Sequence, residues 1–331
     1  MFKYFMKRLV FLILTFLIIT YLLYALLCLV PGNPLMYRMP DEYSSEEEQP
    51  SEAKAALGII TVNYAKWMGF WPDERGKLNG LLQGNLGSSA ATPRSVAEIV
   101  SIPFANTMFL NTASTLLTMA ITIPLGIYCA VHYKSRTDAA IQTLTLVGSS
   151  VPLFLIALLA IFIFAVVFKI FPATGMQTPG ARLHGAALMV DRLHHLALPI
   201  LCLTFAGMAN LTRTVRAAMV DTLTQDYIRT ARAKGLREKI VVYSHAWRNA
   251  LLPVSTALGD WIIAIFSGGS LIIETSFALV GTGSLFWNSL KSVDFEIVLC
   301  LQVIYILALL VGRLIVDFTY VLTDPRIKIE K

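Results

Sequence analysis

Charged residues are scarce in this chain. Of its 331 residues, 15% are Asp, Glu, Lys or Arg, whereas 56% are hydrophobic. A soluble domain carries about 25% charged residues. An apolar excess of this size cannot be buried in one soluble core and indicates a chain that lipid solvates in part. Composition therefore excludes an ordinary soluble domain.

The charge that is present has a basic excess, with 27 Lys and Arg against 21 Asp and Glu. Long apolar runs separate the basic residues, so they form no continuous basic patch in the sequence. This spacing favours positively charged loops at a membrane face over a nucleic-acid surface. We expect these loops to meet membrane lipid and no nucleic acid.

Motifs of nucleotide-binding and catalytic sites are missing. No G-x-x-x-x-G-K-[ST] phosphate loop occurs, and Gly76-Lys77 lacks the upstream glycine. The five histidines lack H-E-x-x-H spacing, and the adjacent His194 and His195 would point in different directions. We therefore expect no catalytic residue, no metal, no cofactor and no nucleotide held by such a loop.

Cysteines are few. Each of the four lies in an apolar stretch, and no two have the spacing of metal ligands: Cys28, Cys129, Cys202 and Cys300. We interpret them as small buried apolar residues.

Six apolar segments approach or exceed the length of about 20 residues that a transmembrane helix needs. They occupy residues 9–30, 106–131, 139–168, 196–215, 251–273 and 297–322. The first resembles a signal peptide, but it exceeds the roughly 7–15 residues of a signal's apolar region, and no A-x-A cleavage site follows. The sequence predicts an all-α membrane protein with six transmembrane helices.

The loops predict the orientation of these helices. Lys and Arg gather before the first segment, after the second, after the fourth and after the sixth. Because basic loops stay in the cytoplasm, we expect both termini there. The expected divisions are a tail with the first helix (1–30), a large external loop (31–103), a transmembrane core (104–323) with a cytoplasmic loop (221–250), and a cytoplasmic C-terminal tail (324–331).

The external loop starts acidic and becomes amphipathic around Trp67, Phe70 and Trp71. Two interpretations stay open. The loop could be an ordered cap whose aromatic residues lie in a local core or at the lipid interface, or it could be a docking surface for an external partner.

Ionisable residues are nearly absent from the apolar segments; the exceptions are Asp260, Glu274, Arg313 and Asp317. The last two are four residues apart on one helix face, so we expect a structural ion pair. Asp260 and Glu274 are candidates for a transport pathway, or else polar residues with partners inside the bundle. This scarcity argues against an ion-coupled secondary transporter, which needs ionisable residues deep in its spans.

The expected cytoplasmic loop contains QDYIRTARAKGL at 225–236 and HAWRNALLPV at 245–254. This pattern predicts a short helix, a glycine turn, a second basic helix and a proline that opens a transmembrane helix. Such a short helix lies on the membrane face. Either anionic lipid or the groove of a partner protein would hold it there.

These residues closely resemble the coupling loop of ABC importer permeases in the dipeptide/oligopeptide (nickel) transport family, in the first-permease (B-type) subunit. The resemblance continues in order at GNLG (84–87), GSSVPLF (148–154), FPATG (171–175), HLALP (195–199), ETSF (274–277) and DPRI (324–327). Two departures are Arg229-Thr230-Ala231, where the general importer loop has Glu-Ala-Ala, and residues 277–283, which lack a proline common in the family.

The resemblance implies the type I ABC importer permease fold in a bacterial inner membrane. Two different homologous permeases would form the pathway, two ATPase subunits would bind ATP and Mg, and an external solute-binding protein would deliver the substrate. The residues implied to couple to the ATPase are Asp226, Tyr227, Ala231, Ala233, Lys234 and Gly235, with the alanines allowing close approach and the glycine the turn. The implied substrate is a peptide; the alternatives are nickel, glutathione or another small solute, and a non-transporting membrane scaffold or receptor subunit is a further rival.

Overall fold

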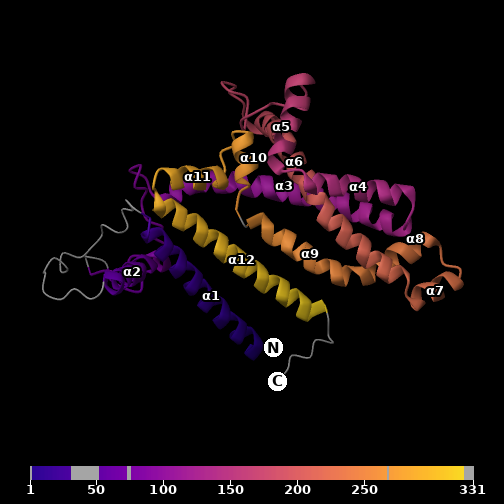
Figure 1. The fold of residues 1–331 in the computed structure, drawn as a ribbon, viewed down its shortest axis with the longest axis horizontal. Helices are drawn as coiled ribbons and strands as arrows, with labels where there is room; N and C mark the ends of the chain where they lie inside the picture. Colours follow the sequence, from indigo (N-terminus) through magenta and orange to yellow (C-terminus); the bar gives the residue numbers. More distant parts are fainter. Residues whose placement is uncertain (1, 31–51, 73–75, 267, 324–331) are drawn as a thin grey trace. The chain divides into compact units, whose positions relative to one another are not determined.

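The computed structural model describes residues 2–30, 52–72, 76–266 and 268–323 (Figure 1). The C-terminal tail and the acidic start of the external loop lie outside these ranges. Within them the chain is helical, and the only β pairing is an isolated bridge between Ser88 and Ser95. The elements are α1 (Phe2–Cys28), α2 (Glu52–Met68), η2 (Leu81–Gln83), α3 (Val96–Val131), α4 (Arg136–Ser150), α5 (Leu153–Ala160), η3 (Ile161–Val167), α6 (Gly185–Leu223), α7 (Asp226–Ala233), α8 (Glu238–Ile240), η4 (Val241–Trp247), α9 (Arg248–Phe266), α10 (Leu271–Ser276), α11 (Thr282–Lys291) and α12 (Phe295–Thr323).

Among the residues that the structure describes, four helices, α1, α3, α6 and α12, are long and apolar enough to cross a membrane. Two bent helix pairs raise the number to as many as six if each pair is one span. These pairs are α4 with α5 and η3, and Glu238–Leu251 with Pro253–Phe266. An all-α membrane protein of this kind is what the sequence predicts, and the fold class is confirmed.

The third predicted segment is not a straight helix. Its two halves meet at an angle of 102° between α4 and α5. Val151 has an extended backbone (φ −81°, ψ 130°), and Pro152 starts the second half. A residue before proline avoids helical backbone angles, and proline itself donates no hydrogen bond, so the helix ends here.

The fifth predicted segment differs from expectation. Pro253 does not open a helix but lies inside α9, at a break where the flanking halves bend by 56°. Helix α9 ends at Phe266, and the separate short helix α10 follows. Residues 251–273 are therefore not one helix.

The described residues separate into two compact units. The first, within Met1–Ala105 and Ser284–Leu310, contains a core of aromatic and aliphatic side chains from α1, α2 and the start of α12. Tyr64 of α2 shares a 2.8 Å hydrogen bond with Thr20 of α1. Trp67 packs in this local core, as one interpretation of the loop expects, whereas Phe70 and Trp71 are exposed.

The second unit, within Asn106–Gly283 and Val311–Lys328, is organised around α6. Three neighbouring helices approach α6 at glycines: an added Cβ would lie 2.7 Å from Val215 at Gly126 of α3, 2.9 Å from Phe205 at Gly148 of α4, and 2.3 Å from Trp261 of α9 at Gly207 of α6 itself. Small residues let membrane helices approach closely where apolar burial supplies little driving force. In Figure 1, α4 lies beside α6, with α7 and α8 at one end.

Candidate functional site

The short helix α7 has the features of a well-terminated helix. Asp226 lies in its first turn and Arg232 in its last, and both charges complement the helix dipole. Gly235 follows with φ +75°, a left-handed conformation that glycine adopts without strain. The chain then turns into α8 and the π-helical η4, which continues into α9.

Helix α7 has a buried face and an exposed face. Ile228 and Ala231, three residues apart, are 0% and 7% exposed. They pack in one core with side chains from the ends of α3 and α6 and from η4 and α9. Tyr227, Ala233 and Lys234 face outward, and Tyr227 is 46% exposed. The chain's own core therefore fixes α7, and its outer side is open to a partner.

Ala231 lies on a different side of α7 from the one expected. The resemblance implies that Ala231, like Ala233, allows close approach by a partner. The helical period instead places Ala231 beside Ile228 on the inner face, so its small side chain lets α7 pack closely on its own chain. Ala233 is exposed on the outer side.

The space around Gly235 is open. A Cβ added there would meet no atom within 4 Å. The glycine therefore serves the backbone turn, as expected, and not a close contact within this chain. Its N–H donates to the carbonyl of Arg232 at 2.9 Å, which completes the end of α7.

An ion pair spans the turn. Nη2 of Arg232 donates to Oε1 of Glu238 at 2.7 Å, and Nε donates to Oε2 at 3.2 Å. These hydrogen bonds to the carboxylate raise the pKa of the Arg232 guanidinium. Both side chains are substantially exposed, so the pair orients the turn and adds little stability.

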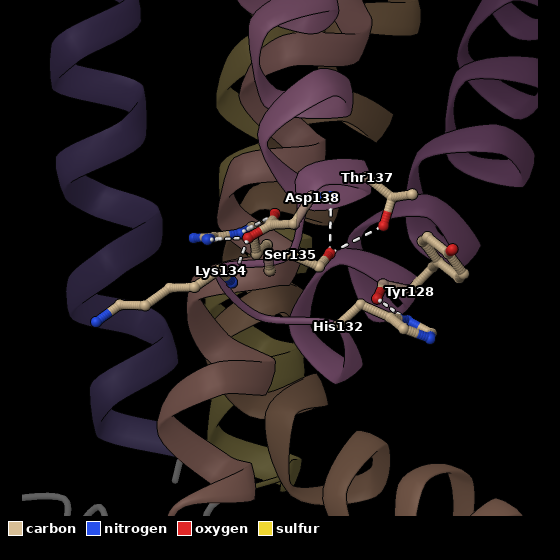
Figure 2. Close-up of polar contacts among 7 residues, drawn as sticks. Tyr128, His132, Lys134, Ser135, Thr137 and Asp138 are labelled. Atoms are coloured by element: carbon tan, nitrogen blue, oxygen red, sulfur yellow. Dashed lines mark hydrogen bonds and ion pairs between the residues drawn. The ribbon is translucent and has the colours of Figure 1, made fainter.

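Asp138 takes part in capping the N-terminus of α4 (Figure 2). Ser135 caps the helix, and its Oγ accepts a hydrogen bond from the Asp138 N–H at 3.1 Å. Oδ2 of Asp138 accepts in turn from the backbone N–H of Lys134 at 3.0 Å. This reciprocal pattern is close to a capping box, and it holds a negative charge at the positive end of the helix dipole.

The same carboxylate joins α4 to α6. Nε of Arg216 donates to Oδ1 at 2.7 Å, and Nη2 donates to Oδ2 at 2.6 Å. The Asp138 side chain is 3% exposed, and the ring of Tyr133 lies 5.0 Å from the Arg216 guanidinium. Removing one partner of a buried pair of this kind costs about 3–5 kcal/mol, because it leaves the other charge unpaired.

Glu274 of α10 lies in a buried polar network. It is 1% exposed, and its Oε1 accepts a hydrogen bond from Oγ1 of Thr107 at 2.9 Å. Thr107 in turn accepts from the N–H of Thr282 at 2.9 Å. A Cβ added at Gly269 or Gly281 would lie 2.0 or 2.4 Å from the same Oε1, so both glycines are required by the close approach of the carboxylate.

Helix α3 holds the segment around α10 at two further points. Nδ2 of Asn106 donates to the carbonyl of Val280 at 2.8 Å. Nδ2 of Asn111 donates to the carbonyls of Ile265 and Gly268, both at 3.0 Å, where α9 ends. These side-chain hydrogen bonds satisfy backbone carbonyls at points where the chain departs from a continuous helix.

Comparison with known proteins places these features in a family. Residues 122–329 match the model of the binding-protein-dependent transport system inner membrane component. The chain belongs to this family. The match covers α4 to α12, including α7 and the Asp138–Arg216 pair.

Curated relatives of this permease align along most of its length. The oligopeptide transport system permease protein AppB of Bacillus subtilis is 36% identical over 302 residues, which cover 90% of each chain. The dipeptide transport system permease protein DppB of the same organism is 34% identical over 77% of this chain and 78% of its own. The glutathione transport system permease protein GsiC of Pectobacterium atrosepticum is 32% identical over 99% of both.

The remaining charged candidates of the permease do not lie on α7. Asp260 is exposed on α9, two residues before the exposed Ile262. Arg313 is exposed on α12, and the side chain of Asp317 lies outside the described residues, so their ion pair stays a prediction. The adjacent histidines bind backbone instead: His194 contacts the carbonyl of Ile170 at 2.8 Å, and His195 that of Asp191 at 2.9 Å.

Sequence reasoning missed the Asp138–Arg216 pair and the polar residues of α3. Asp138 follows the capping residue Ser135 by three positions, which is a recognisable helix-start signal. Nothing in the sequence indicates its partner 78 residues away. Across the part of the permease that the structure describes, no group of three or more His, Cys, Asp or Glu is arranged to hold a metal.

Proposed function

We propose that this permease forms half of the import pathway for peptides and couples that pathway to ATPase subunits. One observation carries the proposal: α7 is anchored in the permease core by Ile228 and Ala231 while its outer side stays exposed. A partner protein that binds the exposed side of α7 and displaces the helix would therefore move the permease core as well.

The coupling surface comprises the exposed residues Asp226, Tyr227, Ala233, Lys234 and Gly235, with Ala231 seating the helix from within. An ATPase pair that closes on ATP would displace α7. The displacement would switch the spans between access from inside and access from outside, as in other rigid-body transitions. The permease itself has no phosphate loop, so the proposal assigns ATP and Mg to the ATPase subunits.

The other proposed partners are a second, homologous permease in a heterodimer and an external solute-binding protein. The family description names a binding-protein-dependent system. Several helices of the permease expose large apolar side chains, such as Leu144 of α4 and Phe154 of α5. Lipid or a second permease can cover such faces.

The proposed orientation puts α7 and both termini in the cytoplasm and the loop 31–103 outside. Basic residues concentrate on α7 and its flanks, which supports this orientation. The divisions 1–30, 31–103, 104–323 and 324–331 follow from it.

The two pathway candidates divide under this proposal. Asp260 is exposed on its helix, which supports a place beside the pathway or the second permease. Glu274 is enclosed by Thr107 and two glycines, which supports a structural role and no contact with the transported molecule in this conformation.

Peptides are the substrate class that the names of two relatives support, one for oligopeptides and one for dipeptides. The test is ATP-dependent uptake of a labelled tripeptide by cells with and without this permease, with its partner subunits present in both. We expect uptake to be lost on deletion and restored by the intact gene. Failure of any ATPase to co-purify with the permease would overturn the assignment.

Glutathione transport is a second candidate, because a glutathione permease aligns over 99% of this chain. Glutathione is itself a tripeptide with an unusual amide linkage. Competition between unlabelled glutathione and the labelled tripeptide separates the two candidates. Loss of uptake of glutathione alone on deletion would assign it as the substrate.

A further inference from the structure

Helix α4 buries few of its side chains. Its buried residues are Asp138, Thr145 and Gly148, none of which is a large apolar residue. Three of its large apolar side chains, Leu144, Leu146 and Val147, are at least half exposed. Within the described chain, polar and small residues therefore make the most deeply buried contacts of α4.

Two of the contacts between α4 and α6 lie at opposite ends of their shared face. At one end, Asp138 binds Arg216 through two hydrogen bonds of 2.7 and 2.6 Å. At the other, Gly148 lies against the ring of Phe205, where an added Cβ would be 2.9 Å from the ring. The ion pair is the polar and directional contact of the two, and it lies at the end of α4 nearer α7 (Figure 1).

The partner of Asp138 lies where α6 meets α7. Val215, Ala218 and Met219 of α6 are buried in the core that also holds Ile228 and Ala231 of α7. Arg216 is in the same turn of α6. One turn of α6 therefore carries both the side chains that share a core with α7 and the arginine that binds α4.

We propose that the Asp138–Arg216 ion pair couples α4 to α7 mechanically, so that α4 moves when α7 is displaced. A displacement of α7 moves the end of α6 through their shared core, and the two parallel hydrogen bonds transmit it to the start of α4. Helix α4 then transmits the displacement to the bend before α5. Asp138 and Arg216 are positioning residues, since neither is assigned a contact with the transported molecule. The inference rests on the proposed coupling function of α7.

The test uses the assembled complex of this permease, its partner permease and the ATPases in proteoliposomes, with the solute-binding protein and a labelled tripeptide. Two quantities are measured together: tripeptide taken up and ATP hydrolysed. The variants are Asp138→Asn and Arg216→Lys, which keeps the charge but cannot form two parallel bonds. Arg213→Lys is the matched control, because Arg213 lies on the same helix three residues earlier and is exposed.

We expect tripeptide uptake per ATP hydrolysed to fall roughly tenfold in both variants, within the range typical of coupling between distant sites. ATP hydrolysis and co-purification of all subunits should persist, and Arg213→Lys should match the wild type. In the double variant Asp138→Asn/Arg216→Lys, uptake per ATP hydrolysed should be no lower than in the poorer single variant, because both changes disrupt the same ion pair.

An unchanged ratio in assembled Asp138→Asn or Arg216→Lys complexes overturns the inference. An equal loss of uptake and ATP hydrolysis also overturns it, since that pattern belongs to docking or folding. If Asp138→Asn does not assemble, Arg216→Lys decides, and failure of both to assemble assigns the pair to assembly alone. A wild-type complex without ATP-dependent uptake would instead refute the proposed function itself.

Discussion

At the residue scale, the conformation of Gly235 is the feature most open to test. Its φ of +75° is strained for any residue with a Cβ, at a cost of roughly 1–2 kcal/mol, and more for a β-branched one. We expect Gly235→Val to abolish ATP-dependent tripeptide uptake while the permease still inserts into the membrane, because α7 can no longer end in its present position.

Gly180 provides a matched control for this variant. It has the same φ of +75° and the same open surroundings, but it lies far from α7 in the sequence. Gly180→Val should introduce equal backbone strain and leave uptake close to the wild-type level. Equal loss of uptake in the two variants would show that strain alone, and not the position of α7, is responsible.

A second residue-scale prediction concerns the enclosure of Glu274. A Cβ at Gly281 would lie 2.3 Å from the carboxylate carbon of Glu274, which is buried and has no room to swing away. We expect Gly281→Ala to destabilise the folded permease by about 1–3 kcal/mol, the usual cost of overpacking. This loss of stability is measured as a decrease in the melting temperature of the purified complex.

The double variant Glu274→Ala/Gly281→Ala tests the cause. Removal of the carboxylate opens the space that the new methyl group needs, so the double variant should be more stable than the sum of the two single changes predicts. Additive losses would place the effect of Gly281→Ala in the backbone and not in its contact with Glu274.

At the scale of the element, the two faces of α7 should respond differently to truncation. Ile228→Ala removes a fully buried side chain and should cost about 2–5 kcal/mol of local stability. Tyr227→Ala removes a side chain that is 46% exposed and should leave thermal stability unchanged while weakening co-purification of the ATPase. Thermal unfolding and a co-purification ratio, measured on both variants, separate the two roles.

The elements also show what can be predicted from sequence. The apolar runs locate the four long helices and the two bent pairs, because a span of lipid demands a long enough stretch of apolar residues. The shape of the bent pairs is harder to predict. Proline is tolerated inside a membrane span when neighbouring groups satisfy the freed carbonyls, so Pro152 and Pro253 alone do not distinguish a break from a kink. Those neighbours can be distant in sequence, as Asn111 is from the end of α9.

The candidate site is predictable to a similar extent. The spacing of residues 225–236 predicts the short helix and the turn at Gly235, and both are present. Which side of the helix faces its own core is not predictable in this way, because that depends on the positions of α3, α6 and α9 around it. For the same reason the sequence alone does not distinguish the buried Ala231 from the exposed Ala233.

At the scale of the whole molecule, the predicted orientation can be read by chemical labelling. The four native cysteines are all buried, so they contribute little background. We expect Arg237→Cys, beside α7, to resist a membrane-impermeant thiol reagent in intact cells and to react after the membrane is opened. Gln177→Cys, on the exposed segment between η3 and α6, should react in intact cells.

The opposite labelling pattern would invert the orientation and place α7 outside, where no cytoplasmic ATPase could reach it. Equal labelling of both cysteines in intact cells would show that the reagent crosses the membrane. A variant that carries neither added cysteine controls for the native thiols.

The anchoring of α7 by Ile228 and Ala231 has a kinetic consequence. Because the permease orders this helix with its own side chains, a partner that arrives meets a surface already in its final shape. Association then needs no folding step, and its rate should depend on collision and on electrostatic attraction between the partner and the basic residues of α7 and its flanks. The assembly rate should therefore fall as salt is added, while the helix content of the permease stays the same before and after the encounter.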